Sequence, residues 1–244
     1  MQIPDAVALV TGANRGIGRA LVEQLLAAGA RRVHATARVV GSLGDVVALD
    51  PARVVAHALD VTDRRQVAAV ADAARDTTLV LNNAGALAMG DLLDAPFELV
   101  VRDVDTNYFG ALHVARAFAP ILAANAPAHG AALVNVLTIV ALASMPGLGA
   151  YTASKAAAWS MTQSLRASLA PRGVAVHGVY PGAVDTDMIR DFTMAKTSPR
   201  DVADAILAGI EAGTEDIFPD PMSRALYDGW RADHKAVEKQ FATM

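Results

Sequence analysis

Hydrophobic residues occur along this chain in short, nearly continuous runs that alternate with longer amphipathic stretches. Such runs are typical of strands that are buried on both faces of a sheet. Strands of this kind are predicted at residues 6–11, 32–36, 54–59, 79–83, 131–138, 174–180 and 216–219. In the stretches between them apolar positions recur with helical spacing, and helices are predicted at residues 16–28, 63–75, 98–124, 150–170 and 199–212.

The regular alternation of strands and helices predicts an α/β fold. Its expected form is a doubly wound, mostly parallel seven-stranded sheet with helices on both faces, the Rossmann arrangement. The segment 40–52 contains Gly41, Gly44 and Pro51, so only a short helix is expected between the second and third strands. No linker or charge run divides the 244 residues, which predicts a single domain over residues 1–244.

Composition and charge exclude several classes of function. The hydrophobic fraction is 53%, yet the most apolar stretch, residues 131–151, is interrupted by polar residues, Pro146 and glycines, so no membrane span is expected. A net charge of −4 offers no basic surface for nucleic acid. The chain has no cysteine and no recognisable secretory signal, which suits a reducing cytoplasm. Its six histidines are scattered, so no metal site is predicted.

Residues 11–18, with the sequence TGANRGIG, connect the first predicted strand directly to the first predicted helix. Glycines in such a turn permit positive φ angles and let backbone amides approach a bulky anion. The helix N-terminus adds unsatisfied N–H donors and the positive end of its dipole. This arrangement predicts a pyrophosphate site, and a glycine-rich surface turn is the simpler alternative for the motif taken alone.

Tyr151 and Lys155 lie four residues apart in a predicted helix, so their side chains project from one face. A phenol with a pKa near ~10 is a poor acid or base at neutral pH, and a neighbouring ammonium favours its phenolate. Such a pair is suited to the proton transfer of carbonyl reduction or alcohol oxidation. Taken alone, such a pair favours the simpler interpretation, a solvated helix start with an incidental contact, and it gains meaning from the motifs that precede it.

Together these motifs resemble the short-chain dehydrogenase/reductase family in its compact, single-domain form. The resemblance rests on motifs in the family's order and spacing: residues 11–18, Asp60-Val61, Asn82-Asn83-Ala84-Gly85, Asn107, the Tyr151/Lys155 pair, and Pro181-Gly182 followed by Thr186. It implies an oxidoreductase of the carbonyl reductase or alcohol dehydrogenase type, which uses a nicotinamide dinucleotide. It also implies a homodimer or homotetramer formed through the helices near 98–124 and 150–170.

The resemblance further implies which residues bind the dinucleotide. Those of the first turn are Gly12, Asn14, Arg15, Gly16, Ile17 and Gly18. Those beside the adenine, along the nucleotide and near the nicotinamide are, in turn, Asp60 and Val61; Asn83, Ala84 and Gly85; and Pro181, Gly182, Val184 and Thr186. Tyr151 and Lys155 are expected to contact the cofactor as well.

The end of the second predicted strand indicates which dinucleotide is used. An acidic residue there would bind a free ribose 2′-hydroxyl, but this chain has Arg38 and no carboxylate at that position. The planar guanidinium fork of Arg38 suits a 2′-phosphate, with Arg15 as a second contact. The predicted cofactor is therefore NADP(H).

One catalytic position departs from the family pattern. Thirteen residues before the tyrosine, where the family usually has serine, this chain has Thr138. Its hydroxyl is expected to orient the substrate carbonyl, although the added methyl restricts χ1 and takes up space. By resemblance, Tyr151 donates the proton, Lys155 lowers the phenol pKa and holds the nicotinamide ribose, and Asn107 maintains a helix irregularity and a water that links the lysine to solvent. Ser144 is the less favoured alternative to Thr138.

The substrate pocket is expected to be bordered by residues 87–89, 140–148 and 187–198. Its predicted lining residues are Val140, Met145, Met188 and Phe192. The segment 187–198 resembles the family's mobile lid. A helical tail over residues 220–244 either covers the pocket or packs on a neighbouring subunit. These apolar side chains favour a small apolar ketone or aldehyde.

Two alternatives to a carbonyl reductase remain at this point. The first is an NADP(H)-binding regulatory or sensor protein in which Thr138 marks lost catalysis; the retained Tyr151, Lys155 and Asn107 favour the enzyme. The second is halohydrin elimination on the same fold. That reaction requires an arginine-type partner and a disrupted nucleotide loop, whereas Lys155 and the glycines are intact.

Overall fold

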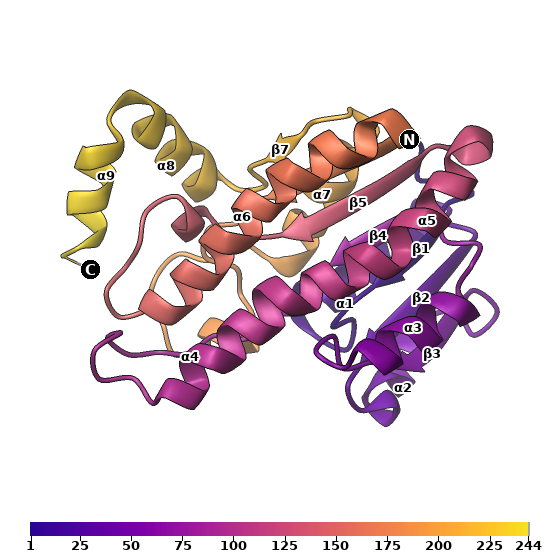
Figure 1. The fold of residues 1–244 in the computed structure, drawn as a ribbon, viewed down its shortest axis with the longest axis horizontal. Coiled ribbons are helices and arrows are strands. Elements are labelled where there is room, and N and C mark those ends of the chain that lie inside the picture. The colour runs from indigo at the N-terminus through magenta and orange to yellow at the C-terminus, as the bar shows by residue number, and fades with distance from the viewer. Residues whose placement is uncertain (244) are drawn as a thin grey trace.

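The seven predicted strands form one parallel sheet in the computed structural model, which describes residues 1–243. Their order across the sheet is β3-β2-β1-β4-β5-β6-β7 (Figure 1). The strands are β1 (Val7–Val10), β2 (Arg32–Ala37), β3 (Val54–Ala58), β4 (Leu79–Asn82), β5 (Ala131–Val136), β6 (Val174–Val179) and β7 (Asp216–Ile217). The predicted Rossmann-like fold is therefore confirmed.

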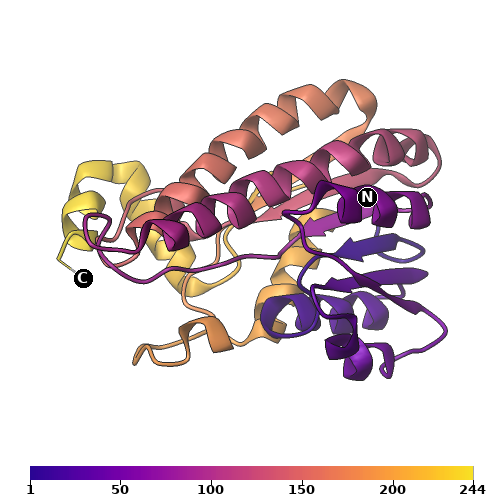
Figure 2. The same cartoon turned by 60° about the horizontal axis from the view of Figure 1, so that its bottom comes forward.

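Helices cover both faces of the sheet (Figures 1 and 2). They are α1 (Gly16–Ala27), α2 (Gly44–Val47), α3 (Arg64–Ala73), α4 (Phe97–Val104), α5 (Ala111–His129), α6 (Gly149–Leu169), α7 (Pro199–Glu211), α8 (Pro221–Ala232) and α9 (His234–Phe241). As expected, the connection between β2 and β3 holds only the 3₁₀ turn Val40–Leu43 and the single turn of α2. Within residues 1–243, none of the helices combines the length and apolar character needed to cross a bilayer.

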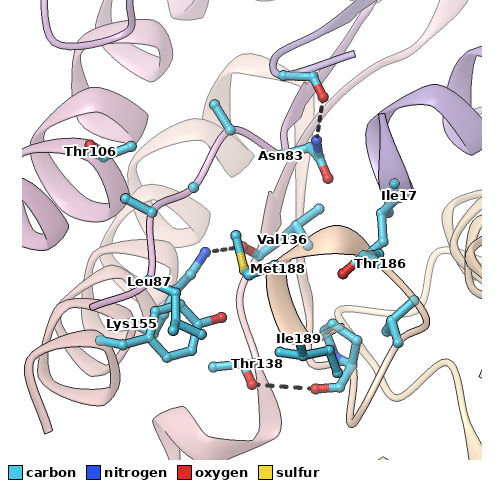
Figure 3. Close-up of a pocket in the computed structure, with 18 of the residues that line it drawn as sticks. Ile17, Asn83, Leu87, Thr106, Val136, Thr138, Lys155, Thr186, Met188 and Ile189 are labelled. Atoms are coloured by element: carbon cyan, nitrogen blue, oxygen red, sulfur yellow. Dashed lines mark hydrogen bonds between the residues drawn. The ribbon is translucent and has the colours of Figure 1, made fainter. Parts of the chain in front are cut away.

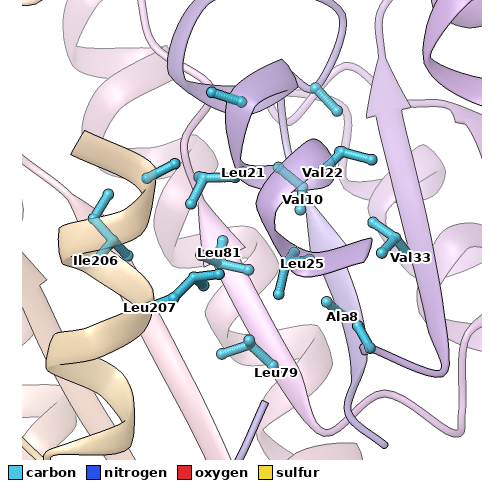
Figure 4. Close-up of a cluster of buried hydrophobic side chains, with 14 of the residues drawn as sticks. Ala8, Val10, Leu21, Val22, Leu25, Val33, Leu79, Leu81, Ile206 and Leu207 are labelled. Atoms are coloured by element: carbon cyan, nitrogen blue, oxygen red, sulfur yellow. The ribbon is translucent and has the colours of Figure 1, made fainter. Parts of the chain in front are cut away.

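The nearly continuous apolar runs are explained by burial on two sides. In β1, Ala8 and Val10 join the cluster beneath α1 and α7, whereas Leu9 between them joins the cluster on the opposite face. Figure 4 shows the first cluster, in which Leu21 and Leu25 of α1 lie over these strands. Since successive side chains of a strand point to opposite faces, a sheet covered twice needs apolar residues at every position.

The strand order reverses between β1 and β4, and this reversal determines where a ligand can bind. β1 pairs with β2 on one side, through Val10 and Ala35, and with β4 on the other, through Val10 and Leu81. The chains leaving β1 and β4 therefore diverge at the carboxyl edge of the sheet. Open α/β sheets bind ligands in the crevice formed at this point.

The helix predicted over residues 98–124 is three segments in the structure: α4, a π-helical segment (Asp105–Gly110) and α5. The helix irregularity expected at Asn107 is thus present, because Asn107 lies within the π-helical segment and its side chain binds the backbone of Ala86. At Gly110 a Cβ atom would lie 2.5 Å from Val61 Cγ2, so the segment also packs tightly against the loop after β3.

Candidate active site

A cavity of about 810 Å³ opens at the carboxyl edge of the sheet, a volume typical of small-molecule sites. Its wall combines the turn after β1, the loops after β2 to β6, the start of α6 and the C-terminal tail. All predicted cofactor, catalytic and substrate-pocket residues line this cavity except Gly18 and Asn107, which lie behind the wall. The structure thus brings motifs from the whole length of the chain to one site.

The glycine turn after β1 has a shape that only small residues permit. Gly12 has a φ of +64°, and a Cβ on Gly18 would lie 2.1 Å from the Gly12 carbonyl oxygen. The Asn83 side chain holds the turn by donating from Nδ2 to the carbonyl oxygens of Thr11, at 2.9 Å, and Gly12, at 3.1 Å. Figure 3 shows one of these two bonds. Asn83 therefore shapes the loop, a role that its position in the motif did not reveal.

The N-terminus of α1 satisfies the requirements of an anion site. The N-cap residue Arg15 makes no capping hydrogen bond through its side chain, and the first turn contains no acidic residue. The helix therefore directs free backbone N–H donors and the positive end of its dipole at the cavity. These residues fit the pyrophosphate of a dinucleotide.

The end of β2 lies beside the same cavity. Ala37, Arg38 and Ser42 contribute to its wall. Ser42 was not predicted, because a serine in a short loop carries no signal of its own; its hydroxyl donates to the Val39 carbonyl at 2.7 Å. Arg15 lies 3.5 Å from the carboxylate of Asp187, so it connects the glycine turn to the segment 187–198.

Tyr151 and Lys155 project from the first turns of α6 toward the end of β5. Lys155 Nζ donates to the Val136 carbonyl at 2.7 Å and lies 5.9 Å from the centroid of the Tyr151 ring (Figure 3). Thr138 makes two long hydrogen bonds to the backbone, donating to the Pro181 carbonyl at 3.4 Å and accepting from the Val140 amide at 3.4 Å. Because both bonds are long, they hold the Thr138 hydroxyl only weakly.

The electrostatics of this pair differ from the sequence-based expectation. Burial raises the pKa of Tyr151 to about 12, a rise that a hydrogen bond with Thr138 partly opposes and the charge of Asp103 reinforces. Burial lowers the pKa of Lys155 to about 8, against the opposing effect of Asp103. Lys155 therefore does not bring the phenol below its ordinary pKa, because both groups are removed from water. At neutral pH Tyr151 carries its proton and is ready to donate it.

Asn107 connects three parts of the site from behind the cavity wall. Its Oδ1 accepts from the Ala86 amide at 2.9 Å, and its Nδ2 donates to the Ala86 carbonyl at 2.8 Å and to Ser154 Oγ at 2.8 Å. Ser154 in turn donates to the Tyr151 carbonyl at 2.7 Å. Asn107 thus fixes α6 relative to the loop after β4.

Two remaining nucleotide-side residues make contacts that also stabilise the loops around them. Asp60 Oδ1 accepts from the amide and the hydroxyl of Thr62, and Asp60 still lines the cavity. A Cβ on Gly16 would lie 3.1 Å from Thr186 Cγ2, so the glycine turn and the loop after β6 are in close contact.

Ser144, the alternative to Thr138, forms a hydrogen bond with Thr152 at 2.7 Å and does not line the cavity. Thr138 therefore remains the candidate hydroxyl beside Tyr151.

The end of the cavity formed by the residues after β5, the segment 187–198 and the C-terminal tail is lined mainly by apolar side chains. Val140, Met145, Met188 and Phe192, the residues predicted to line the substrate pocket, lie in this wall. Leu87, Ile189 and Met194 complete the wall on the side of the segment 187–198.

The C-terminal tail covers this end of the cavity. Met222 and Leu226 of α8 and Phe241 of α9 line it, and Phe241 is buried. Trp230 anchors the tail by donating from Nε1 to the Leu142 carbonyl at 3.1 Å. Of the two positions expected for the tail, the structure therefore shows the one over the pocket.

Comparisons with known proteins agree with this geometry. The family model described as short chain dehydrogenase matches residues 6–197. The 1-deoxy-11-beta-hydroxypentalenate dehydrogenase of Streptomyces avermitilis is 35% identical, over 98% of this chain and 94% of that protein. A short chain dehydrogenase from Burkholderia cenocepacia, solved in complex with NADP, has 42% identity and a TM-score of 0.92, with 99% of both chains covered. A short chain dehydrogenase/reductase from Burkholderia phymatum, solved with NAD, has 27% identity and a TM-score of 0.87, covering 98% of this chain and 96% of that one.

Proposed function

Because the chain belongs to the short-chain dehydrogenase family, we propose that it is an NADP(H)-dependent oxidoreductase that interconverts a ketone or aldehyde and an alcohol. One observation carries the proposal. Tyr151, whose pKa burial raises to about 12, lines one cavity together with Lys155, Thr138 and apolar side chains, and the glycine turn and Arg38 line the same cavity. The 42% identical structure that holds NADP supports the choice of cofactor.

The residues around the glycine turn are the proposed cofactor site. The amides at the N-terminus of α1 would bind the pyrophosphate, and Arg38 would bind the 2′-phosphate. When bound, NADP(H) supplies the two-electron redox partner of the carbonyl or alcohol. The remaining steps depend on this chain's own residues.

In the direction of reduction, Tyr151 donates its phenolic proton to the substrate oxygen. The Thr138 hydroxyl donates a hydrogen bond to the same oxygen and fixes the orientation of the carbonyl. Lys155 contributes positive charge beside the phenol. This charge stabilises the phenolate that Tyr151 becomes once it has donated its proton. In the direction of oxidation the same proton returns from the alcohol to Tyr151.

The wall at the substrate end favours an apolar small molecule. Its side chains are chiefly methionine, leucine, isoleucine, valine and phenylalanine, which offer contact area and few hydrogen bonds. Methionine side chains adapt to ligands of different shape. We therefore expect a preference for apolar ketones and aldehydes over polar ones.

Consumption of NADPH with a panel of aryl ketones, keto esters and aldehydes tests the proposed function. We expect oxidation of NADPH with formation of an equal amount of alcohol for apolar members of the panel. Tight binding of NADPH with no consumption across the panel would refute the enzymatic proposal and favour the sensor alternative.

The two substitutions at Thr138 separate the contribution of its hydroxyl from that of its methyl. Thr138→Ser keeps the hydroxyl and is expected to retain or raise the rate of ketone reduction. Thr138→Val keeps the shape and removes the donor, so the rate should fall by about 10²-fold, as for loss of one donor to a developing oxyanion. Rates of the two purified variants, measured at saturating NADPH, check this; equal rates would show that the hydroxyl has no role.

Phe241 is expected to limit the size of the substrate. Phe241→Ala removes a buried ring from the cavity wall, so the ratio of kcat/KM for a bulky ketone to that for a small one should rise about 10-fold or more. Val237→Ala is the matched control, because Val237 belongs to the same apolar cluster without lining the cavity. An equal rise of this ratio in both variants would mean that loosening of α9, rather than space, causes the effect.

The homo-oligomer expected from the family is supported by exposed apolar residues on and beside α4 and α5. Leu93 is 94% exposed and Phe97 is 76% exposed, and Val101 and Phe109 are also exposed. Large apolar side chains in this number favour contact with another subunit. Light scattering after size-exclusion chromatography should give the mass of a dimer or tetramer, and the mass of one chain would contradict this prediction.

A further inference from the structure

Asp103 is a buried carboxylate that the proposed reaction has not so far used. It lies on α4 with an exposed fraction of 0%. Its Oδ2 accepts from the Ala88 amide at 2.7 Å, and its Oδ1 lies 3.0 Å from the guanidinium of Arg102, which is half-exposed. Burying a charge costs several kcal/mol, and a half-exposed arginine and one amide offset only part of this cost, so the position of Asp103 needs a further explanation.

The first part of the explanation is the backbone that Asp103 binds. Asp103 and Asn107 are one helical turn apart, and both bind the segment that follows the nucleotide loop after β4. Asn107 holds Ala86 through two hydrogen bonds, and Asp103 holds Ala88 through one. The segment 86–88 is therefore fixed at both ends from one side.

Gly85, immediately before this segment, lies close to Asn107 and Lys155. A Cβ atom on Gly85 would lie 3.2 Å from Asn107 Oδ1 and 3.8 Å from Lys155 Nζ. Leu87, between the two fixed residues, lines the cavity. Any shift of the segment would therefore change both the surroundings of the Lys155 ammonium and the substrate wall.

The second part of the explanation is charge. The elements packed beside Tyr151 and Lys155 carry several charged groups: Asp103, Arg102 and Glu98 on α4 and Asp105 on the π-helical segment, of which Arg102, Glu98 and Asp105 line the cavity. On the other side, β5 and the residues after it contribute the uncharged Val136 carbonyl and Thr138 hydroxyl. The charge of Asp103 raises the pKa of Lys155 and of Tyr151, in each case favouring the protonated group.

We propose that Asp103 is a positioning residue of this active site, which fixes the segment 86–88 beside Lys155 and supplies the buried counter-charge of the Lys155 ammonium. The inference rests on the proposed function for its catalytic meaning. In that reaction Asp103 helps to keep Lys155 a cation over the neutral pH range, and it adds to the larger effect of burial that keeps Tyr151 protonated. Asp103 touches neither the substrate nor the cofactor in this scheme.

The lysine content of the chain allows a direct test. There are only four lysines, at positions 155, 196, 235 and 239, and Lys155 is the buried one. In protein labelled with [ε-¹³C]lysine and free of ligand, NMR follows the titration of each lysine, and the Lys155→Met variant identifies the Lys155 signal. This measurement needs neither substrate nor nucleotide, so its outcome does not depend on whether ketone reduction is observed.

We expect Asp103→Asn, which keeps an acceptor for Ala88 and removes the charge, to lower the titration midpoint of Lys155 by roughly half a pH unit or more. Asp103→Glu restores the charge and should return the midpoint toward that of the unchanged protein. Asp94→Asn, which removes an exposed carboxylate before α4, should leave it unchanged. If Asp103→Asn does not fold, as judged by thermal unfolding, Asp103→Ser replaces it.

The pH dependence of reduction gives a second readout. Since a lower midpoint means that Lys155 loses its charge at a lower pH, the fall in kcat/KM on the alkaline side should move to lower pH by a similar amount in Asp103→Asn. A Lys155 midpoint that is the same in the folded neutral variant as in the unchanged protein would overturn the proposal. So would a midpoint in Asp103→Glu that is lowered as far as in Asp103→Asn.

Discussion

Replacing Tyr151 with phenylalanine is expected to slow ketone reduction by about 10²–10⁴-fold, the usual contribution of a positioned general acid. The phenol is protonated at neutral pH because burial raises its pKa to about 12, so the hydroxyl removed is the one that carries the proton. The ring remains, and the NADPH dissociation constant should change by no more than about 10-fold, because one neutral hydrogen bond contributes about 0.5–1.5 kcal/mol of net free energy. Rates at saturating NADPH, with NADPH binding followed by its fluorescence, measure both quantities.

A matched control separates this effect from a general loss of structure. Tyr108 lies in the π-helical segment, is partly buried and does not line the cavity, so Tyr108→Phe should retain nearly full activity. Near-normal turnover of Tyr151→Phe would remove Tyr151 from the role of acid. Equal losses in the two variants would attribute the effect to altered packing.

The Arg38→Asp variant is expected to reverse the cofactor preference. It removes a charge-assisted contact worth about 1.5–3 kcal/mol, so NADPH should bind roughly 10- to 150-fold more weakly. The new carboxylate also repels a 2′-phosphate and can accept hydrogen bonds from a free 2′-hydroxyl, so NADH should bind more tightly than before. Dissociation constants for both nucleotides, measured by titration calorimetry, give the ratio directly.

Arg31→Asp is the control for a change of net charge. Arg31 is exposed just before β2, at the end of that strand opposite Arg38, and it does not line the cavity. Its replacement should leave both dissociation constants nearly unchanged. Tight binding of NADPH by Arg38→Asp would disprove the assignment of the 2′-phosphate site.

The sheet was predictable because its strands are apolar at nearly every position. In β1 and β4 every residue is buried, as a sheet covered on both faces requires. Helix ends were harder to predict. Local propensity predicted that the helix from residue 98 would end at 124, whereas α5 continues to His129 with Pro120 and Pro127 inside it. Tertiary packing of α5 on the sheet outweighs the cost of the prolines.

The position of the cavity-lining motifs was predictable from their spacing, since each follows a strand that ends at the same edge of the sheet. The roles of the residues behind the cavity wall could not be predicted in this way. Asp103 and Ser154 act through contacts with Ala88 and Asn107, which are distant in sequence, and neither belongs to a recognisable motif. Phe241 lies beyond the residues that the family model matches. Its position in the cavity wall could be seen only once the fold of the C-terminal tail was known.

The protonation states of Tyr151 and Lys155 could not be predicted from the sequence either, because they depend on burial. A lysine four residues from a tyrosine predicts a lowered phenol pKa if both groups are exposed to solvent. Here Lys155 donates to the Val136 carbonyl and burial dominates both groups, so the phenol remains protonated. The resulting site is prepared to donate a proton rather than to hold a phenolate.

A crystal structure with NADP⁺ and an unreactive ketone tests the central claim most directly, through the distance from the ketone oxygen to the Tyr151 hydroxyl. The account predicts that this oxygen lies within hydrogen-bonding distance, about 2.6–3.2 Å, of both the Tyr151 and the Thr138 hydroxyl groups. A ketone oxygen bound elsewhere in the cavity, with the Tyr151 hydroxyl directed into packed hydrocarbon, would contradict it.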